Sequence, residues 1–310
     1  MIGNFLAVAQ QVAILFVLIG AGALMRRMRL LTTGSVEGLI NVLILVVTPC
    51  LIVDVFQRPF DPSMLRGLGL AFLIAAAAHV AVIVAALLLV RHGNADIRRP
   101  LLLSAVFSNA GFMGIPLEQA MLGNGGVFYG IVYVVVFNLF MWSWGLCMMK
   151  KGERKAMNLH SIVNPGTVGI ALGLPLFLCS VRLPEVLGVP VHQMANLNTP
   201  LAMLVIGYCL VGAKLGKVVR IGAVFVAAGI RLVVFPLAVI AALYPFRAAL
   251  DRDLMLALVI AASAPVAAMV SMFASKFGRD VDVSVAVVSG TTLLSVFTMP
   301  PVIALAMAVL

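Results

Sequence analysis

Long apolar runs separated by short polar stretches make up almost the whole chain. Most of these runs are close to the ~20 residues that a helix needs to cross the hydrocarbon core of a bilayer. The polar stretches between them are too short to hold a soluble domain. The pattern predicts an all-α membrane protein with ten transmembrane helices, at residues 5–25, 36–56, 68–90, 101–121, 127–149, 162–180, 195–213, 219–243, 254–275 and 283–306.

Composition and charge agree with this class of protein. Apolar residues make up 63% of the 310-residue chain and charged residues 10%, whereas a soluble domain carries about 25% charged residues. The alternating strands of a transmembrane barrel would not give long unbroken apolar runs. No base-stacking motif accompanies the net charge of +10, so no nucleic-acid partner is expected. The cysteines show no CxxC spacing, and neither a metal nor another cofactor is expected.

Basic residues are concentrated in alternate loops, and this asymmetry predicts the orientation of the chain. The positive-inside rule places the richer set of loops in the cytoplasm. An even number of helices then puts both termini outside, in the periplasm if the membrane is a bacterial inner membrane. The poorer set holds Arg58, Arg66, Arg182, Arg247 and Arg252; the richer set holds Arg26, Arg27, Arg29, Arg91, Arg98, Arg99, Lys150, Lys151, Arg154, Lys155, Lys214, Lys217, Arg220, Lys276 and Arg279.

Two halves of five helices, residues 1–155 and 156–310, must have opposite orientations because five is an odd number. Thr48-Pro49 recurs as Thr199-Pro200, and Pro116 recurs as Pro265, both about 150 residues later, as an inverted repeat requires. Inverted repeats with interrupted helices in matching positions are typical of secondary transporters. The sequence therefore predicts two inverted five-helix repeats.

The fourth segment holds the strongest candidate for an interrupted helix. Asn109, Gly111, Gly114 and Pro116 fall near its middle, and both glycine and proline weaken a membrane helix there. We expect an unwound stretch between two half-helices, which implies a cavity. The half-helix that begins near Pro116 would offer free amide donors to a carboxylate, and Asn109 can donate and accept. An ordinary proline kink is the alternative.

The ninth segment repeats the pattern with Ser263-Ala264-Pro265. The two breaks are expected to face each other around one pseudo-twofold axis, although a simple kink at Pro265 remains equally open. Ser295 in the tenth segment is a further candidate for substrate binding. Its hydroxyl shares one helical face with those of Thr291 and Thr298, a pattern that more often serves helix packing.

Three ionisable side chains lie inside apolar runs. Arg231 could be the countercharge of an anionic substrate, a neighbour of Glu118, or a structural arginine that caps the carbonyls of a broken helix. Glu118 could carry a coupling proton or stabilise the first turn of a half-helix. His79 could relay protons or serve as a hydrogen-bonded packing residue.

The motifs of hydrolases and nucleotide-driven pumps are absent from the sequence. It holds no HExxH, GxSxG or GxxxxGK[ST], so an enzyme is not expected and an ion or substrate gradient would supply the energy. A secondary transporter of a small organic anion, coupled to H+ or Na+, is the first hypothesis. A membrane receptor or sensor that binds a small carboxylate without transport is the alternative.

Several motifs, in chain order, resemble those of the auxin efflux carrier family, which includes bacterial malonate transporters and plant PIN-type carriers. The resemblance implies a fold similar to that of bile-acid sodium symporters, with scaffold helices 1, 2, 6 and 7 and transport helices 3–5 and 8–10. It also implies a homodimer formed through the scaffold, an elevator motion, and a carboxylate such as malonate bound where broken helices 4 and 9 cross at their prolines. The motifs are Asn109-x-Gly111-x-x-Gly114-x-Pro116, Asn164-Pro165, Ala264-Pro265 and Ser289 through Pro300 (SGTTLLSVFTMP).

Overall fold

The computed structural model describes residues 2–150, 165–211 and 221–310, and every regular element within them is a helix. Outside them lie Asn164, the predicted boundary between residues 155 and 156, and the basic residues Lys151, Arg154, Lys155, Lys214, Lys217 and Arg220. The first half holds α1 (Ile2–Arg27), α2 (Thr33–Val42), η1 (Leu43–Val47), α3 (Thr48–Val55), α4 (Pro62–Leu89), α5 (Ala95–Val106), η2 (Ala110–Gly114), α6 (Ile115–Phe140), η3 (Met141–Gly145) and α7 (Leu146–Met149).

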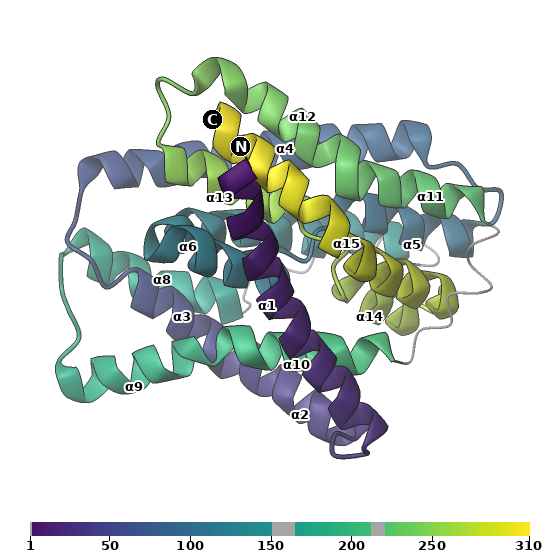
Figure 1. Ribbon diagram of the computed structural model, residues 1–310, viewed down its shortest axis with the longest axis horizontal. Helices are drawn as coiled ribbons and strands as arrows, with labels where there is room; N and C mark the ends of the chain where they lie inside the picture. Colours follow the sequence, from purple (N-terminus) through teal and green to yellow (C-terminus); the bar gives the residue numbers. More distant parts are fainter. Residues whose placement is uncertain (1, 151–164, 212–220) are drawn as a thin grey trace.

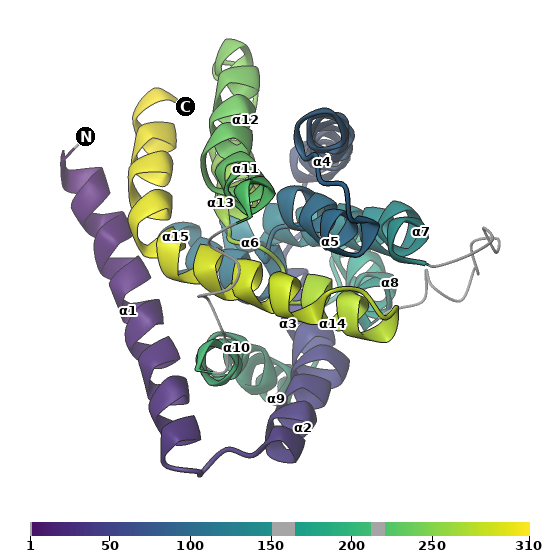
Figure 2. The same ribbon diagram turned by 90° about the vertical axis from the view of Figure 1, so that its right-hand side faces the viewer.

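The second half is built from a similar series of helices (Figure 1). The start of α1 and the end of α15 lie near each other at one end of the molecule in both views (Figures 1 and 2). The elements are α8 (Pro165–Leu178), α9 (Glu185–Asn196), α10 (Asn198–Leu210), α11 (Gly222–Gly229), η6 (Ile230–Val234), α12 (Phe235–Leu243), η7 (Tyr244–Phe246), α13 (Arg252–Ser263), α14 (Met269–Lys276) and α15 (Val281–Val309).

The all-α membrane class is confirmed, because six helices among the described residues are long and apolar enough to cross a membrane. Every one of the ten segments marked in the sequence contains helix, but ten crossings in two inverted repeats stay a prediction. The six long helices are Leu6–Arg27, Thr33–Val55, Pro62–Leu89, Ala110–Met149, Gly222–Phe246 and Val281–Val309.

Two local features depart from the segment boundaries read in the sequence. Helix α9 occupies a stretch that the sequence predicts as a loop, and Glu185 in its first turn suits the positive end of the helix dipole. Within the long helix α6, Gly123 has a φ of 63°, which a residue with a Cβ rarely adopts. This glycine separates the fourth predicted segment from the fifth.

Three prolines follow π-helical turns, and the proline ring explains the position of each turn. The turns η1, η2 and η6 each end two residues before a proline: Pro49, Pro116 and Pro236. A proline has no N–H and clashes with the carbonyl one turn back, so widening the preceding turn relieves both problems. At the first of them, the Thr48 hydroxyl donates to the Leu43 carbonyl (2.8 Å).

Helix α1 packs against α10 so closely that no side chain separates the two backbones. A Cβ on Gly22 would lie 2.8 Å from the Leu204 Cα and collide with its carbonyl, and a Cβ on Gly207 would collide with the Ile19 carbonyl. Around this contact, Val12 and Leu15 of α1 and Met203 of α10 are buried in one apolar cluster. Small residues at such positions allow membrane helices to approach closely.

We predict that Gly22→Ala destabilises the protein by about 1–3 kcal/mol, because the added methyl group has no space against α10. Gly20→Ala is the matched control in the same helix, since a Cβ there meets no atom within 4 Å. Alanine has the higher helix propensity, so that variant should unfold at the same or a higher temperature. Thermal unfolding in detergent checks both; an equal effect of the two substitutions would contradict the close contact.

Candidate substrate site at the helix crossover

Two chain segments from opposite halves run past each other where helices α5 and α13 end. Helix α5 ends at Val106, and Phe107 is extended; α13 ends at Ser263, and Ala264 is extended. Ala264 precedes a proline, and the proline ring disfavours helical backbone at that position. We call the resulting pair of segments, residues 107–109 and 264–267, the crossover.

Backbone hydrogen bonds hold the crossover together in the manner of a short antiparallel ladder. The Asn109 N–H donates to the Pro265 carbonyl (2.6 Å), and the Ala267 N–H donates to the Phe107 carbonyl (3.0 Å). Ser108 and Val266 form the bridge between them. Pro265 has no N–H to donate, but its carbonyl accepts the hydrogen bond from the Asn109 N–H.

Thr291 of α15 adds a third chain segment to the crossover. Its hydroxyl oxygen accepts from the Val266 N–H (3.2 Å), and its hydroxyl donates to the Val287 carbonyl (2.8 Å). The sequence singled out Ser295 as the site residue of this helix and missed Thr291, although the shared face of the hydroxyls was the signal. In the structure, the Ser295 hydroxyl donates to the Thr292 carbonyl of its own helix (2.7 Å).

Arg231 joins the two helix ends at the crossover. Its Nη1 donates to the Val106 carbonyl (2.8 Å) and its Nη2 to the Ala262 carbonyl, while its guanidinium lies 4.6 Å from the Phe235 ring centre. The side chain is fully buried, and its Nε has no hydrogen-bond partner among the described residues. A cation at the C-terminal ends of two helices is stabilised by both helix dipoles.

The four predicted residues of the fourth segment are divided between two places. Asn109 lies in the crossover, retains 7% of its accessible surface, and makes no side-chain hydrogen bond with the described residues. Gly114 packs against α13, where an added Cβ would lie 3.5 Å from the Ala261 Cα, and Gly111 has open space beside it. Pro116 lies outside the crossover.

The position of Pro116 differs from the expectation in a way that helix geometry explains. The helix restarts at Ala110, since the amides of Met113 and Gly114 already donate to the Asn109 carbonyl (2.9 and 3.2 Å). Pro116 is the seventh residue of the new helix, where the widened turn η2 accommodates its ring and its missing N–H. The segment that crosses Pro265 is therefore residues 107–109, and the amides at the new helix start belong to residues 110–112.

Glu118 is buried against the fifth predicted segment. Its side chain is fully buried, neither carboxyl oxygen has a hydrogen-bond partner, and no ion pair to Arg231 occurs among the described residues. Gly130 provides the space for the carboxyl group, because a Cβ on that residue would collide with Oε2. Burying an ionised carboxylate in this way is costly.

His79 lies among aromatic rings that include Phe107 of the crossover. Its Nδ1 lies 2.8 Å from the Ala75 carbonyl of its own helix, and its Nε2 has no hydrogen-bond partner in the described part of the chain. The imidazole is stacked on Phe140 with ring centres 5.4 Å apart, and it also contacts Tyr133 and Phe107. Ser263, the remaining predicted residue, is buried and donates to the Ile260 carbonyl of its own helix (2.9 Å).

The apolar helices, of which several can span a bilayer, define a multi-pass membrane protein. Over residues 7–303 the chain matches the family model described as membrane transport protein, which is that of the auxin efflux carrier family, and it belongs to that family. This match confirms the resemblance read in the sequence motifs. Members of the family are transporters. No curated protein matches the chain in a sequence comparison.

We predict that Arg231→Met lowers the free energy of unfolding by about 2–4 kcal/mol, because two buried carbonyls lose their charged donor. Arg247→Met is the control. That arginine also donates to a carbonyl and lies over a tyrosine ring (4.0 Å), but it is exposed, so its loss should change stability by less than about 0.5 kcal/mol. Denaturant unfolding in micelles measures the free energy of unfolding of both variants. If Arg231→Met were as stable as the wild-type protein, the capping role of Arg231 would be refuted.

Proposed function

We propose that the chain is a secondary active transporter of a small organic anion, such as malonate or another carboxylate, in a bacterial inner membrane. Family membership supports transport. The observation that carries the anion site is the side-chain amide of Asn109, which makes no hydrogen bond with the described residues and lies beside the ends of two helices that a buried guanidinium joins. The bound species would be an anion small enough to lie between backbone amides.

The proposed site uses Asn109 and the N–H groups at the start of the new helix. The first turn of a helix leaves its amide donors free, and the positive end of the helix dipole attracts a carboxylate. Gly111 has open space beside it and would let an anion approach the backbone. Pro265, Ser263 and Ser295 would form the walls.

Arg231 would act through its charge and position instead of by direct contact. Both of its Nη atoms already serve the carbonyls of Val106 and Ala262. A fixed positive charge in a water-poor interior still lowers the energy of a nearby anion, because Coulomb attraction is weakly screened there. This role combines two of the three alternatives that the sequence left open for this residue, the countercharge and the structural cap.

The coupling ion would be a proton carried by Glu118. A carboxyl group that is buried without a partner for either oxygen is most stable when neutral, and it has to meet water before it can release its proton. Movement of α6 would supply that exposure. His79 is the second candidate because its Nε2 is free and its ring lies against the crossover residue Phe107; Na+ is the alternative ion.

The proposed motion is an elevator, with predicted helices 1, 2, 6 and 7 as a scaffold and the others as the moving part. Apolar side chains of α1 and α10 face Met113 and Leu117 across this boundary, and such a surface forms no directional bonds that a sliding motion would break. The same proposal includes a homodimer formed through the scaffold, the two inverted repeats, and termini in the periplasm.

Uptake by reconstituted liposomes tests the function directly. The full chain is reconstituted, and uptake of labelled malonate and related carboxylates is followed under a proton gradient, a sodium gradient or neither. Uptake is expected for at least one carboxylate. Binding to the purified protein with no uptake under any gradient would favour the receptor alternative and would refute transport.

We predict that Asn109→Ala reduces carboxylate uptake by about 10- to 100-fold, the loss expected when a hydrogen bond to a charged group is removed. Expression and thermal stability should not change, since the side-chain amide of Asn109 makes no hydrogen bond with the residues that the structure describes. Asn138→Ala is the control, because its amide donates to the Val134 carbonyl of its own helix (2.9 Å). Wild-type uptake by Asn109→Ala would place the site elsewhere.

We predict that Glu118→Gln abolishes uptake driven by a pH gradient but preserves exchange of labelled for unlabelled carboxylate. The amide keeps the shape of the neutral carboxyl group but cannot release a proton. Glu185→Gln, an exposed position in the first turn of α9, is the control and should retain pH-driven uptake. Proton-coupled uptake of normal rate in Glu118→Gln would exclude this residue, and a requirement for Na+ would exclude the proton.

A further inference from the structure

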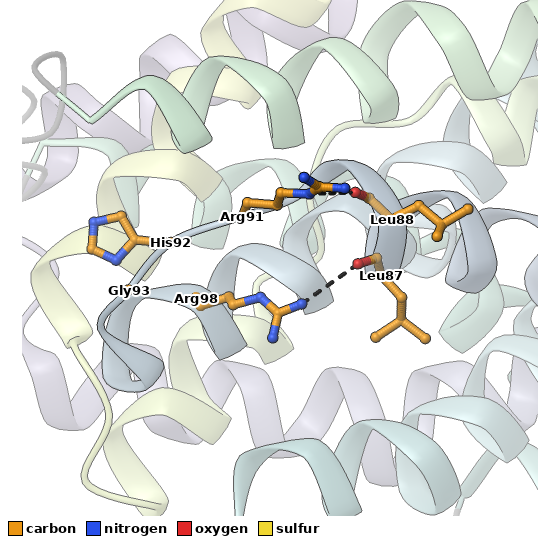
Figure 3. A pocket seen from close by; sticks show the side chains of 6 residues that line it. All are labelled: Leu87, Leu88, Arg91, His92, Gly93 and Arg98. Carbon is orange, nitrogen blue, oxygen red and sulfur yellow. Dashed lines mark hydrogen bonds between the residues drawn. The ribbon is translucent and has the colours of Figure 1, made fainter.

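A basic cleft lies at the end of α4, away from the crossover (Figure 3). It has a volume of about 640 Å³ and is open to the surroundings. Two leucines of the last turn of α4 form part of its lining. The rest comes from two basic residues and a glycine of the following loop and from one arginine of α5. The lining residues are Leu87, Leu88, Arg91, His92, Gly93 and Arg98.

Each arginine of the cleft donates some of its guanidinium N–H groups to carbonyls at the end of α4, and its other N–H groups make no hydrogen bond with the described residues. Arg91 Nε donates to the Leu88 carbonyl (3.1 Å), and Arg98 donates to the carbonyls of Val90 through Nε (3.1 Å) and of Leu87 through Nη2 (3.5 Å). Both Nη atoms of Arg91 and the Nη1 of Arg98 make no hydrogen bond with the described residues. These contacts fix the two cations where helix α4 ends.

His92 adds a further donor at the edge of the cleft. Its Nδ1 lies 3.1 Å from the Asn94 nitrogen and 3.3 Å from the Asn94 oxygen; when Nδ1 accepts from the Asn94 N–H, the proton of a neutral ring is on Nε2. The nearby carboxylate, that of Asp96, is ion-paired to Arg279 (2.5 Å) and does not line the cleft. The cleft therefore offers donors and positive charge to a phosphate group.

A continuous apolar path leads along α4 to this cleft. Val80, Val84 and Leu88 are each more than half exposed (52%, 51% and 60%), and their spacing of four residues places them on one face of the helix. The opposite face, which includes Ala75, His79 and Ala86, is buried. Figure 2 shows α4 at the periphery of the molecule.

We propose that this cleft and the exposed face of α4 bind one anionic phospholipid. The phosphate would accept hydrogen bonds from Arg91, Arg98 and His92, and an acyl chain would lie along Leu88, Val84 and Val80. Basic pockets where a membrane helix ends on its cytoplasmic side bind such headgroups, and α4 is apolar up to Leu89. The proposal uses no property of the crossover and does not depend on the proposed transport function.

Native mass spectrometry of the full chain in a neutral detergent tests the proposal. Phosphatidylglycerol and phosphatidylcholine with identical acyl chains are the lipid probes, and inorganic phosphate is the third. Wild-type protein is expected to bind phosphatidylglycerol at least about fivefold more tightly than phosphatidylcholine, and Arg91→Gln should reduce that preference about fivefold. Equal affinity for the two lipids would refute the site.

Arg66→Gln is the matched control, because it removes the same charge from an exposed position at the other end of the same helix. It should keep the full preference; an equal loss in both variants would mean attraction by net charge without a site. If equimolar inorganic phosphate displaced phosphatidylglycerol, the ligand of the cleft would be a free phosphate ion, and the lipid proposal would be refuted. A change of oligomeric state in Arg91→Gln without a change in lipid binding would instead assign the cleft to contact with a second copy.

Discussion

The hydrogen bonds of the backbone at the crossover are the constraint on which the centre of the molecule depends. A bilayer offers no water to satisfy the carbonyls left where a helix ends, and here α5 and α13 both end inside the fold. Arg231 provides charged donors to both ends, the ladder between the Asn109 and Ala267 amides satisfies the extended backbone, and Thr291 accepts from Val266. Four parts of the chain that are far apart in sequence are thereby held at one point.

Much of the helical framework could be predicted, because apolar runs and prolines act locally. The run lengths placed helix in every marked segment, and three of the π-helical turns, η1, η2 and η6, are each followed by a proline two residues later; η3 has no such proline. The boundary at Ala110 could not be predicted in this way, since it is set by the pairing of residues 107–109 with the extended segment 264–267, more than a hundred residues away. Pro116 suggested a break in the helix near its own position, but the helix is interrupted earlier in the chain, at residues 107–109.

The candidate site was predictable in its residue types but not in its contacts. Asn109 and Pro265 come together as their positions in two matching breaks suggested. For Arg231 the sequence left a structural and a binding role open, and only its two carbonyl partners identify the capping contact. The burial of Glu118 against Gly130 depends on the turn at Gly123, which folds the fifth segment back on the fourth. No residue pattern within the fourth or the fifth segment indicates that Glu118 and Gly130 lie in contact.

Helix α4 links the crossover to the basic cleft, because its buried face contacts the crossover and its exposed face leads to the cleft. The buried face carries His79 against Phe107 of the crossover, whereas the exposed face leads to Arg91. An arginine drawn toward the centre of a bilayer costs about 2.5–3.5 kcal/mol on insertion scales, so in the proposed topology Arg91 and Arg98 would hold this helix end at the membrane surface. Arg91 follows the end of α4 at Leu89 by two residues, and Arg98 of α5 is hydrogen-bonded to the carbonyls of Leu87 and Val90, so a displacement of α4 along the membrane normal would act on His79 and on both arginines. In the proposed elevator motion, the energy of placing those cations would therefore limit how far the crossover can move with α4.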